Sequence, residues 1–177
     1  NADAQLELIE EMLDMNNLAA GTLTLSTARV DLTKLVEGVV TGLRQRATSA
    51  ALTLELAIDR DLTPVTGDPE RLAQITRQLV SYALRASPRG GRVGVTLARS
   101  GSQLQLTVQD SGEGLDSALV PTVFEDFDEE TAPDSLRGMG LKLAILRRLV
   151  ELHSGTIHAE SEGRGRGARF VVKLPAS

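Results

Sequence analysis

Apolar residues recur at three- and four-residue intervals in four stretches of the chain, the spacing typical of helices that bury one face. The first stretch is residues 2–16, where Leu6, Ile9 and Leu13 form a narrow stripe between acidic residues. A helix this short is marginally stable alone. The exposed stripe therefore predicts a partner helix, supplied by a segment outside this chain or by a second copy of it.

Capping residues support the other three helices. Asp31 is a candidate N-cap for a helix to about residue 49. Asp68 followed by Pro69 provides an N-cap and a proline at the first helical position, which predicts a helix to about residue 86. The last helix is expected over roughly residues 140–153.

Alternating apolar and polar residues, bounded by turn-forming residues, predict the strands. They are expected at residues 22–26, 52–58, 92–98, 103–109, 155–162 and 168–174. Helices that alternate with hairpins predict an α/β fold. We expect a two-layer sandwich of a mixed, mostly antiparallel sheet with helices on one face, plus the short N-terminal helix.

Composition narrows the class of protein. A chain of 177 residues buries roughly 70% of its unfolded surface, so the core needs no covalent staples. It has no cysteine, which excludes disulfides and thiolate metal sites. The net charge of -5 argues against nucleic acid as a partner. No apolar run approaches the ~18 residues of a membrane span, and we expect a cytoplasmic location. Because the chain begins with a helix-like stretch, we expect it to be a piece of a longer protein.

The first candidate for chemistry is the glycine motif Asp110-Ser-Gly112-Glu-Gly114. A short carboxylate at a strand end can accept a hydrogen bond from the exocyclic amine of adenine, whereas guanine presents an oxygen there. Gly112 and Gly114 would permit a positive φ and a close approach of the backbone to a ligand. An ordinary Asp-Ser-Gly turn is the alternative that this motif leaves open.

A second glycine motif, Gly138-Met-Gly140-Leu141, leads directly into the last predicted helix. Backbone N–H groups at a helix start form a cradle for phosphate. Alone, this motif is equally compatible with a flexible loop. The two motifs together, in this order, favour a nucleotide site.

From about residue 31 to 175 the chain resembles the catalytic and ATP-binding domain of bacterial sensor histidine kinases, within the gyrase, chaperone and histidine-kinase ATPase superfamily. Besides the glycine motifs, the matching stretches are residues 68–72, 123–127, 143–145 and 151–157. The resemblance implies that residues 1–20 are the stump of a dimerisation helix, 21–30 a linker and 31–177 the catalytic and ATP-binding domain. The stump and the second glycine motif favour kinases over ATP-driven clamps such as DNA gyrase.

The resemblance implies ATP or ADP as ligand, and transfer of the γ-phosphate to a histidine on a separate dimerisation helix. It also implies a response regulator as partner and a homodimer through the N-terminal helix. Neither His153 nor His158 matches the phosphoacceptor; His153 matches a helix end, where a C-terminal cap is expected. We assign no catalytic residue and no metal ligand. The expected nucleotide-binding residues are Tyr82, Arg85, Asp110, Gly112, Gly114, Phe127, Gly138, Gly140, Leu141 and Lys142.

Two departures from the family pattern bear on activity. The family carries two asparagines four residues apart, of which the second binds Mg²⁺, and these positions are Gln78 and Tyr82 here. Mg²⁺ takes small oxygen ligands in a near-ideal octahedron, and a neutral phenol with a pKa of about 10 is a poor one. Lys142 replaces a glycine of the second motif, where its side chain would block the phosphates or substitute in part for the ion.

Arg85 matches a basic residue that faces the phosphates, with a solvated helix residue as the alternative. Phe127, with Phe124, matches a phenylalanine motif at the base of a lid, and core packing explains both equally well. The lid is expected at residues 129–137. Six acids in and before it would repel a triphosphate by about 1 kcal/mol each at short range, unless they form only a solvated loop. They are Glu125, Asp126, Asp128, Glu129, Glu130 and Asp134.

These observations leave two functions open. The first is a histidine kinase domain that binds ATP and has impaired activity. The second is a signalling or interaction module, similar to a pseudokinase, that binds nucleotide weakly, without Mg²⁺, or not at all.

Overall fold

The computed structural model describes residues 2–125 and 127–177, so Asp126 of the acidic lid lies outside the described residues. The helices are α1 (Ala2–Ala20), α2 (Leu32–Ser49), α3 (Pro69–Ala86) and α4 (Gly140–Leu152), with a 3-10 turn at Val120–Thr122. The strands are β1 (Ala28–Val30), β2 (Thr53–Ile58), β3 (Val65–Gly67), β4 (Arg92–Ser100), β5 (Gln103–Gln109), β6 (Thr156–Glu160) and β7 (Arg169–Pro175).

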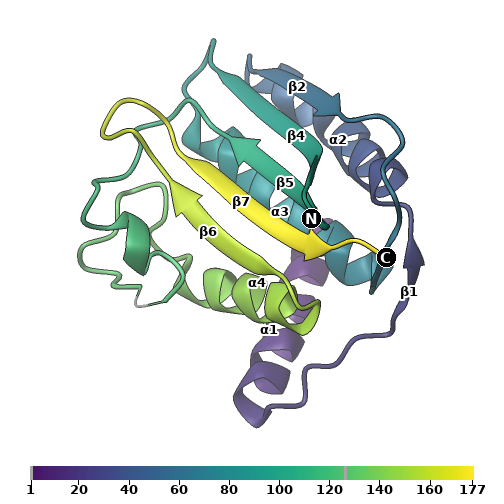
Figure 1. Cartoon of the computed structure of the whole chain (residues 1–177). Coiled ribbons are helices and arrows are strands. Elements are labelled where there is room, and N and C mark those ends of the chain that lie inside the picture. Colours follow the sequence, from purple (N-terminus) through teal and green to yellow (C-terminus); the bar gives the residue numbers. More distant parts are fainter. Residues whose placement is uncertain (1, 126) are drawn as a thin grey trace.

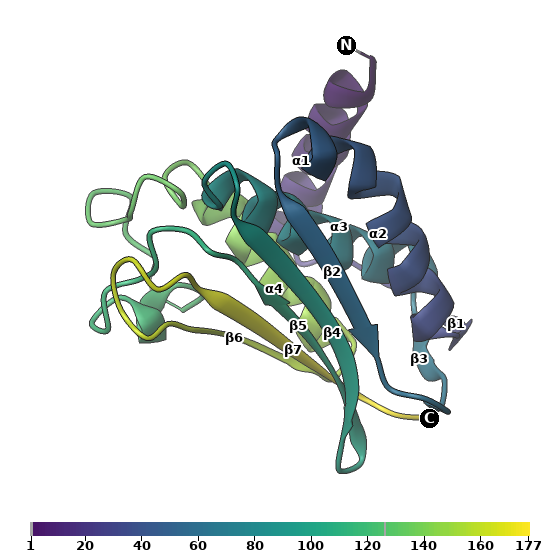
Figure 2. The same cartoon turned by 90° about the horizontal axis from the view of Figure 1, so that it is seen from above.

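Five strands form the main sheet in the order β2-β4-β5-β7-β6 (Figure 1). Strands β2 and β4 run parallel, and every other neighbouring pair is antiparallel. Helices α2, α3 and α4 lie on one side of this sheet (Figure 2). The α/β two-layer sandwich expected from the sequence is therefore confirmed.

The core lies between the sheet and these three helices. Alternate residues of the strands supply one half of it, for example Val95, Leu106 and Phe170, each at most 3% exposed. The helices supply the other half at three- and four-residue spacing, as in Ile75 and Leu79 of α3. The two periodicities thus bury the faces that the sequence pattern indicated.

The prediction of a strand at residues 22–26 is wrong. Residues 22–27 form no regular element, and β1 begins afterwards and pairs with β3, a strand that the pattern did not reveal. The alternation has another origin, because Leu23 is buried in the core and the Ser26 amide donates to Asp68 at 2.9 Å. An extended linker that is anchored at intervals shows the same period as a strand.

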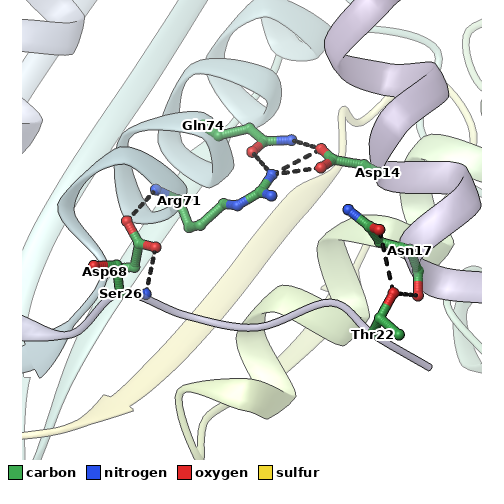
Figure 3. A network of polar contacts seen from close by, with 7 residues as sticks. All are labelled: Asp14, Asn17, Thr22, Ser26, Asp68, Arg71 and Gln74. Atoms are coloured by element: carbon green, nitrogen blue, oxygen red, sulfur yellow. Dashed lines mark hydrogen bonds and ion pairs between the residues drawn. The ribbon is translucent and has the colours of Figure 1, made fainter. Parts of the chain in front are cut away.

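A polar clamp joins α1 to α3 (Figure 3). Asp14 of α1 is 3% exposed. Its carboxylate oxygens accept from Arg71 Nη1 at 2.7 and 2.8 Å, and Gln74 Nε2 donates to Oδ2 at 3.1 Å. Gln74 Oε1 accepts a further bond from Arg71 at 2.9 Å, so the three side chains form a closed network.

Asp68, the N-cap of α3, ties three segments together. Its carboxylate accepts from the amides of Glu70 and Arg71 and from the linker amide of Ser26. Its own amide donates to Nε2 of the buried His153 at 3.0 Å, and His153 Nδ1 donates to the Leu149 carbonyl at 2.7 Å. His153 is the C-cap residue of α4, as expected, and its neutral imidazole also joins α4 to α3.

The apolar stripe of α1 is open to the surface. Leu6, Ile9 and Leu13 are each more than half exposed, and the start of α1 projects beyond the rest of the molecule (Figure 2). Within residues 2–125 and 127–177, no helix has the length and apolar character needed to cross a membrane.

Candidate functional site

Asp110 directly follows β5 and is 3% exposed. Its Oδ1 accepts from the amides of Gly112 and Ala168 at 2.8 and 3.0 Å. Its Oδ2 is buried and has no hydrogen-bond partner among the described residues. Burial raises the pKa of Asp110, the two backbone amides oppose the rise, and Glu113 adds to it. One oxygen is thus fixed by the fold, while the other can accept a donor from a ligand.

The glycines of the first motif serve backbone packing. A Cβ on Gly112 would collide with the Ala86 carbonyl at the end of α3. The φ of Gly112 is not positive, so the prediction of a left-handed conformation is wrong at this residue. Gly114 does have a φ of +73°, and a Cβ there would collide with the Gly163 carbonyl. The close approach that these glycines permit is to protein backbone.

Sequence reasoning missed the contribution of the segment before β7. The Ala168 amide donates to Asp110, and a Cβ on Gly167, which has a φ of +70°, would collide with the Asp110 carbonyl. Ser161 joins the same group by accepting from the Leu115 amide and donating to the Gly167 carbonyl. The one sequence signal that could have indicated this role is the glycine-rich run at residues 163–167.

Tyr82 of α3 is close enough to Asp110 and to Arg85 for both charges to affect its pKa. It is 4% exposed, its ring packs edge-on against Phe170 at a centroid distance of 5.1 Å, and its hydroxyl donates to Ser135 Oγ at 3.2 Å. Burial raises the pKa of Tyr82 to about 12; the hydrogen bond to Ser135 and the charge of Arg85 oppose the rise, and the charges of Asp110 and Glu113 add to it. The phenol is therefore a neutral, packed group near both charged candidates.

These residues do not fit a magnesium site. The Tyr82 hydroxyl is already bonded to the lid, and its ring is packed against the core. Gln78 contributes one buried oxygen, Oε1, without a partner among the described residues. The cleft that Gln78 lines carries four cations against two acids, and this net positive charge would repel a divalent ion. The cations are Arg46, Arg77, Arg85 and Lys142, and the acids are Glu10 and Glu11.

That cleft, of about 110 Å³, lies between α1, α3 and the start of α4. Arg85 Nη2 lies 3.0 Å from the Met139 sulfur, a weak acceptor. The structure thus brings Arg85 and Lys142 together, as an anion site requires. The lining residues are Glu10, Glu11, Arg46, Gln74, Arg77, Gln78, Ser81, Arg85, Met139 and Lys142.

The second glycine motif opens α4 as expected. Gly138 has a φ of +82°, and Met139 makes no side-chain cap. The amides of Gly138 and Gly140 donate to the Glu129 carboxylate at 2.7 and 3.3 Å. A lid side chain therefore lies where the motif predicts a phosphate.

Phe127 and Leu141 are packing residues in this structure. Both are half-buried against the core, and a Cβ on Gly140 would lie 2.9 Å from the Phe127 ring. Phe124 packs edge-on against Phe170 at 5.9 Å, which fits a role at the base of the lid and core packing alike. His158 is half-exposed near Glu160, away from this group.

The sequence matches the family described as histidine kinase-, DNA gyrase B- and HSP90-like ATPases over residues 67–177. The sensor protein DivL of Caulobacter vibrioides is 33% identical over 94% of this chain, which covers 21% of DivL. The chain thus spans about a fifth of the length of this relative.

Two solved structures show the same fold. Full-length ShkA in complex with AMPPNP superposes with a TM-score of 0.82 at 27% identity, over 99% of this chain and 36% of ShkA. The histidine kinase ThkA in complex with the response regulator TrrA gives 0.75 at 19% identity, over 98% of this chain and 49% of ThkA. The fold is that of the catalytic domains of histidine kinases. The chain belongs to the histidine kinase-, DNA gyrase B- and HSP90-like ATPase family.

Proposed function

We propose that this chain is the ATP-binding catalytic part of a sensor histidine kinase in which magnesium-assisted phosphotransfer is impaired. Residues 31–177 would bind the adenine nucleotide, residues 1–20 would belong to a dimerisation helix, and residues 21–30 would link them. The observation that carries the proposal is the buried Oδ2 of Asp110, which has no hydrogen-bond partner among the described residues, while the buried phenol of Tyr82 stands at the family's metal-ligand position.

Adenine recognition rests on Asp110. A buried acceptor without a partner costs free energy that a ligand donor recovers. Asp110 Oδ2 is such an acceptor, and an exocyclic amine is a matching donor. A base that presents a carbonyl at this position would instead meet a second acceptor.

Phosphate recognition rests on cations and backbone amides. Arg85 and Lys142 line one cleft, and Gly138 and Gly140 present amides at the start of α4. Cations and a helix N-terminus both stabilise anions. We propose that Lys142 and Arg85 supply part of the charge neutralisation that Mg²⁺ provides elsewhere in the family.

Impaired transfer rests on Tyr82. Kinases depend on metal ions that bridge the phosphates and neutralise the charge that develops during transfer. The Tyr82 hydroxyl donates to Ser135, and burial raises its pKa from about 10 to about 12, which disfavours the anionic form further. The chain would therefore bind nucleotide better than it transfers phosphate.

The partners follow from the same proposal. Phosphate, if transferred, would pass to a histidine on a dimerisation helix and then to a response regulator, the class of partner bound by ThkA. The exposed stripe of α1 would pair with that helix or with a second copy of the chain.

Calorimetry with ATP and with ADP, each in Mg²⁺ and in EDTA, tests this proposal. We expect wild-type binding that survives EDTA, weaker binding for Lys142→Gly, and a gain of Mg²⁺ dependence for Tyr82→Asn. Tight binding that requires Mg²⁺ in the wild type would contradict impairment. Binding that EDTA abolishes, or that is unchanged in Lys142→Gly, would contradict the role of Lys142.

The alternative is an interaction module that no longer binds nucleotide. The closed lid favours it, because Ala132, Leu136 and Met139 are each at most 6% exposed. The same calorimetry separates the two functions: absence of any heat with ATP and ADP, in a protein shown to be folded, would support the interaction module.

A further inference from the structure

We propose that Glu129 is an internal competitor of the nucleotide phosphates, a lid carboxylate that closes the site by binding the phosphate cradle. The inference rests on the proposed nucleotide binding and adds a regulatory contact to it. Its basis is the place of Glu129 among the backbone donors of the second glycine motif.

The contact uses both oxygens of the carboxylate. Glu129 Oε2 accepts from the Gly138 amide at 2.7 Å, and Oε1 accepts from the Gly140 amide at 3.3 Å. The first residues of a helix carry amides without intrahelical partners, and a negative charge there is favourable. Met139, the N-cap residue, provides no side-chain acceptor, so Glu129 takes that role from the lid.

The far side of the lid is fixed independently. The Ser135 amide donates to Glu113 Oε1 at 3.0 Å, and Ser135 Oγ accepts from the Tyr82 hydroxyl at 3.2 Å. Leu136 is 1% exposed. The lid therefore closes through buried apolar residues and two polar anchors, Ser135 and Glu129, of which Glu129 is the one placed on the cradle.

A phosphate and the Glu129 carboxylate cannot both occupy this cradle. Each would accept from the Gly138 and Gly140 amides, and two anions at that distance repel each other. Phosphate binding must therefore displace Glu129, and displacement releases one polar anchor of the lid. Adenine alone, at Asp110, does not require this displacement.

Glu130 offers a matched control. It is also an exposed lid acid, but the Glu130 side chain makes no hydrogen bond or ion pair within the described residues. Its amide donates to Asp128 at 2.9 Å, and a substitution at the side chain leaves this bond in place. Glu129→Gln and Glu130→Gln therefore change the lid charge equally, and only the first weakens the contact with the cradle.

The test measures amide hydrogen exchange at Gly138 and Gly140 without nucleotide, then ADP and adenosine binding in EDTA. We expect faster exchange at both amides in Glu129→Gln and not in Glu130→Gln. We expect ADP to bind about threefold to tenfold more tightly to Glu129→Gln. Adenosine affinity should change little, because adenosine has no phosphate to compete.

The outcomes separate this inference from the proposed function. Unchanged exchange in Glu129→Gln would overturn the contact, whatever the nucleotide data show. Faster exchange with unchanged ADP affinity, or an equal gain for adenosine, would overturn the competition while leaving nucleotide binding intact. Failure of every variant to bind ADP would overturn the proposed function and the competition together, and the exchange data would still report whether Glu129 holds the cradle.

Discussion

The two ends of α3 differ in how far their polar groups are satisfied. At the N-terminal end, Asp68, Arg71 and Gln74 bond to the linker, to α1 and to each other. In the C-terminal half, Gln78 Oε1 has no partner among the described residues, and neither does Oδ2 of Asp110, whose loop packs against the last residue of α3. One helix thus carries a completed network at one end and an incomplete one at the other.

This difference separates structural roles from binding roles. Buried polar groups in folded proteins are nearly always hydrogen-bonded, so each exception needs an explanation. The completed network at the N-terminal end has a structural role, because it positions α1 and α4 against α3. At the incomplete end, the nucleotide of the proposed function would supply the missing donor to Asp110 Oδ2.

The largest expected effect is at the incomplete end. Asp110→Asn keeps the acceptor for Gly112 and Ala168 but places an amide donor where Oδ2 lies. An adenine amine would then meet a donor, so we expect ATP binding to weaken by about a hundredfold or more. Calorimetry measures this, and urea denaturation should show a stability change within about 1 kcal/mol. Equal binding by the variant would remove Asp110 from the site.

The next effect is at the completed end. Arg71→Gln leaves the buried Asp14 carboxylate without its cation. We expect the docking of α1 to lose about 2 kcal/mol, less than for a fully buried ion pair because Arg71 is partly exposed. We expect faster amide exchange in α1 with little change in the main sheet. Arg77→Gln is the control, since Arg77 forms no ion pair within the described residues. Equal exchange in α1 for both variants would show that the clamp does not hold this helix.

Tyr82 connects the lid to the C-terminal half of α3. Its titration can be measured without interference from other phenols, because it is the single tyrosine of the chain. We expect phenolate absorbance to titrate with a pKa of about 12 in the folded protein, and of about 10 in denaturant. Tyr82→Phe removes the bond to Ser135 and should cost about 1 kcal/mol in urea denaturation. A folded-state pKa of about 10 would show that the phenol is exposed to water.

A smaller effect is expected on the pH dependence of stability, where the direction of the change tests the raised pKa of Asp110. Burial raises the pKa of Asp110 above its ordinary value of 3.8, so the native state binds its proton more tightly than the unfolded chain. The Asp110 contribution to stability is therefore fully present below pH 3.8 and is lost as pH rises through the folded pKa. We expect the unfolding free energy of wild type relative to Asp110→Asn to fall over this window and then level off. A rise would show that the folded pKa is lowered.

The smallest effect is expected away from both ends of α3. Arg92 and Glu55 pair at 3.0 Å across β4 and β2, with both side chains at least half exposed. Such surface pairs contribute little, so Arg92→Ala should change the unfolding free energy by less than about 0.5 kcal/mol. A loss above about 1 kcal/mol would show that polar networks outside α3 also matter to the fold.

Much of the fold followed from local pattern. The caps at Asp31 and Asp68 both accept backbone amides as expected, at the starts of α2 and α3. The same reasoning failed for the linker, where it predicted a strand at residues 22–26. Leu23 and Ser26 instead contact distant parts of the chain and pair with no strand. Periodicity records which residues are buried, and it does not record what buries them.

For the site, the sequence by itself determined the chemistry: a carboxylate at a strand end, glycines where backbones approach, and a phenol in place of a small metal ligand. Only the tertiary structure decided which atoms remain free. Ala168 occupies one oxygen of Asp110 and Glu129 occupies the amides of α4, contacts that span 58 and 11 residues of chain. Hydrogen bonds between such distant groups depend on how the layers pack, and local sequence carries no record of that packing.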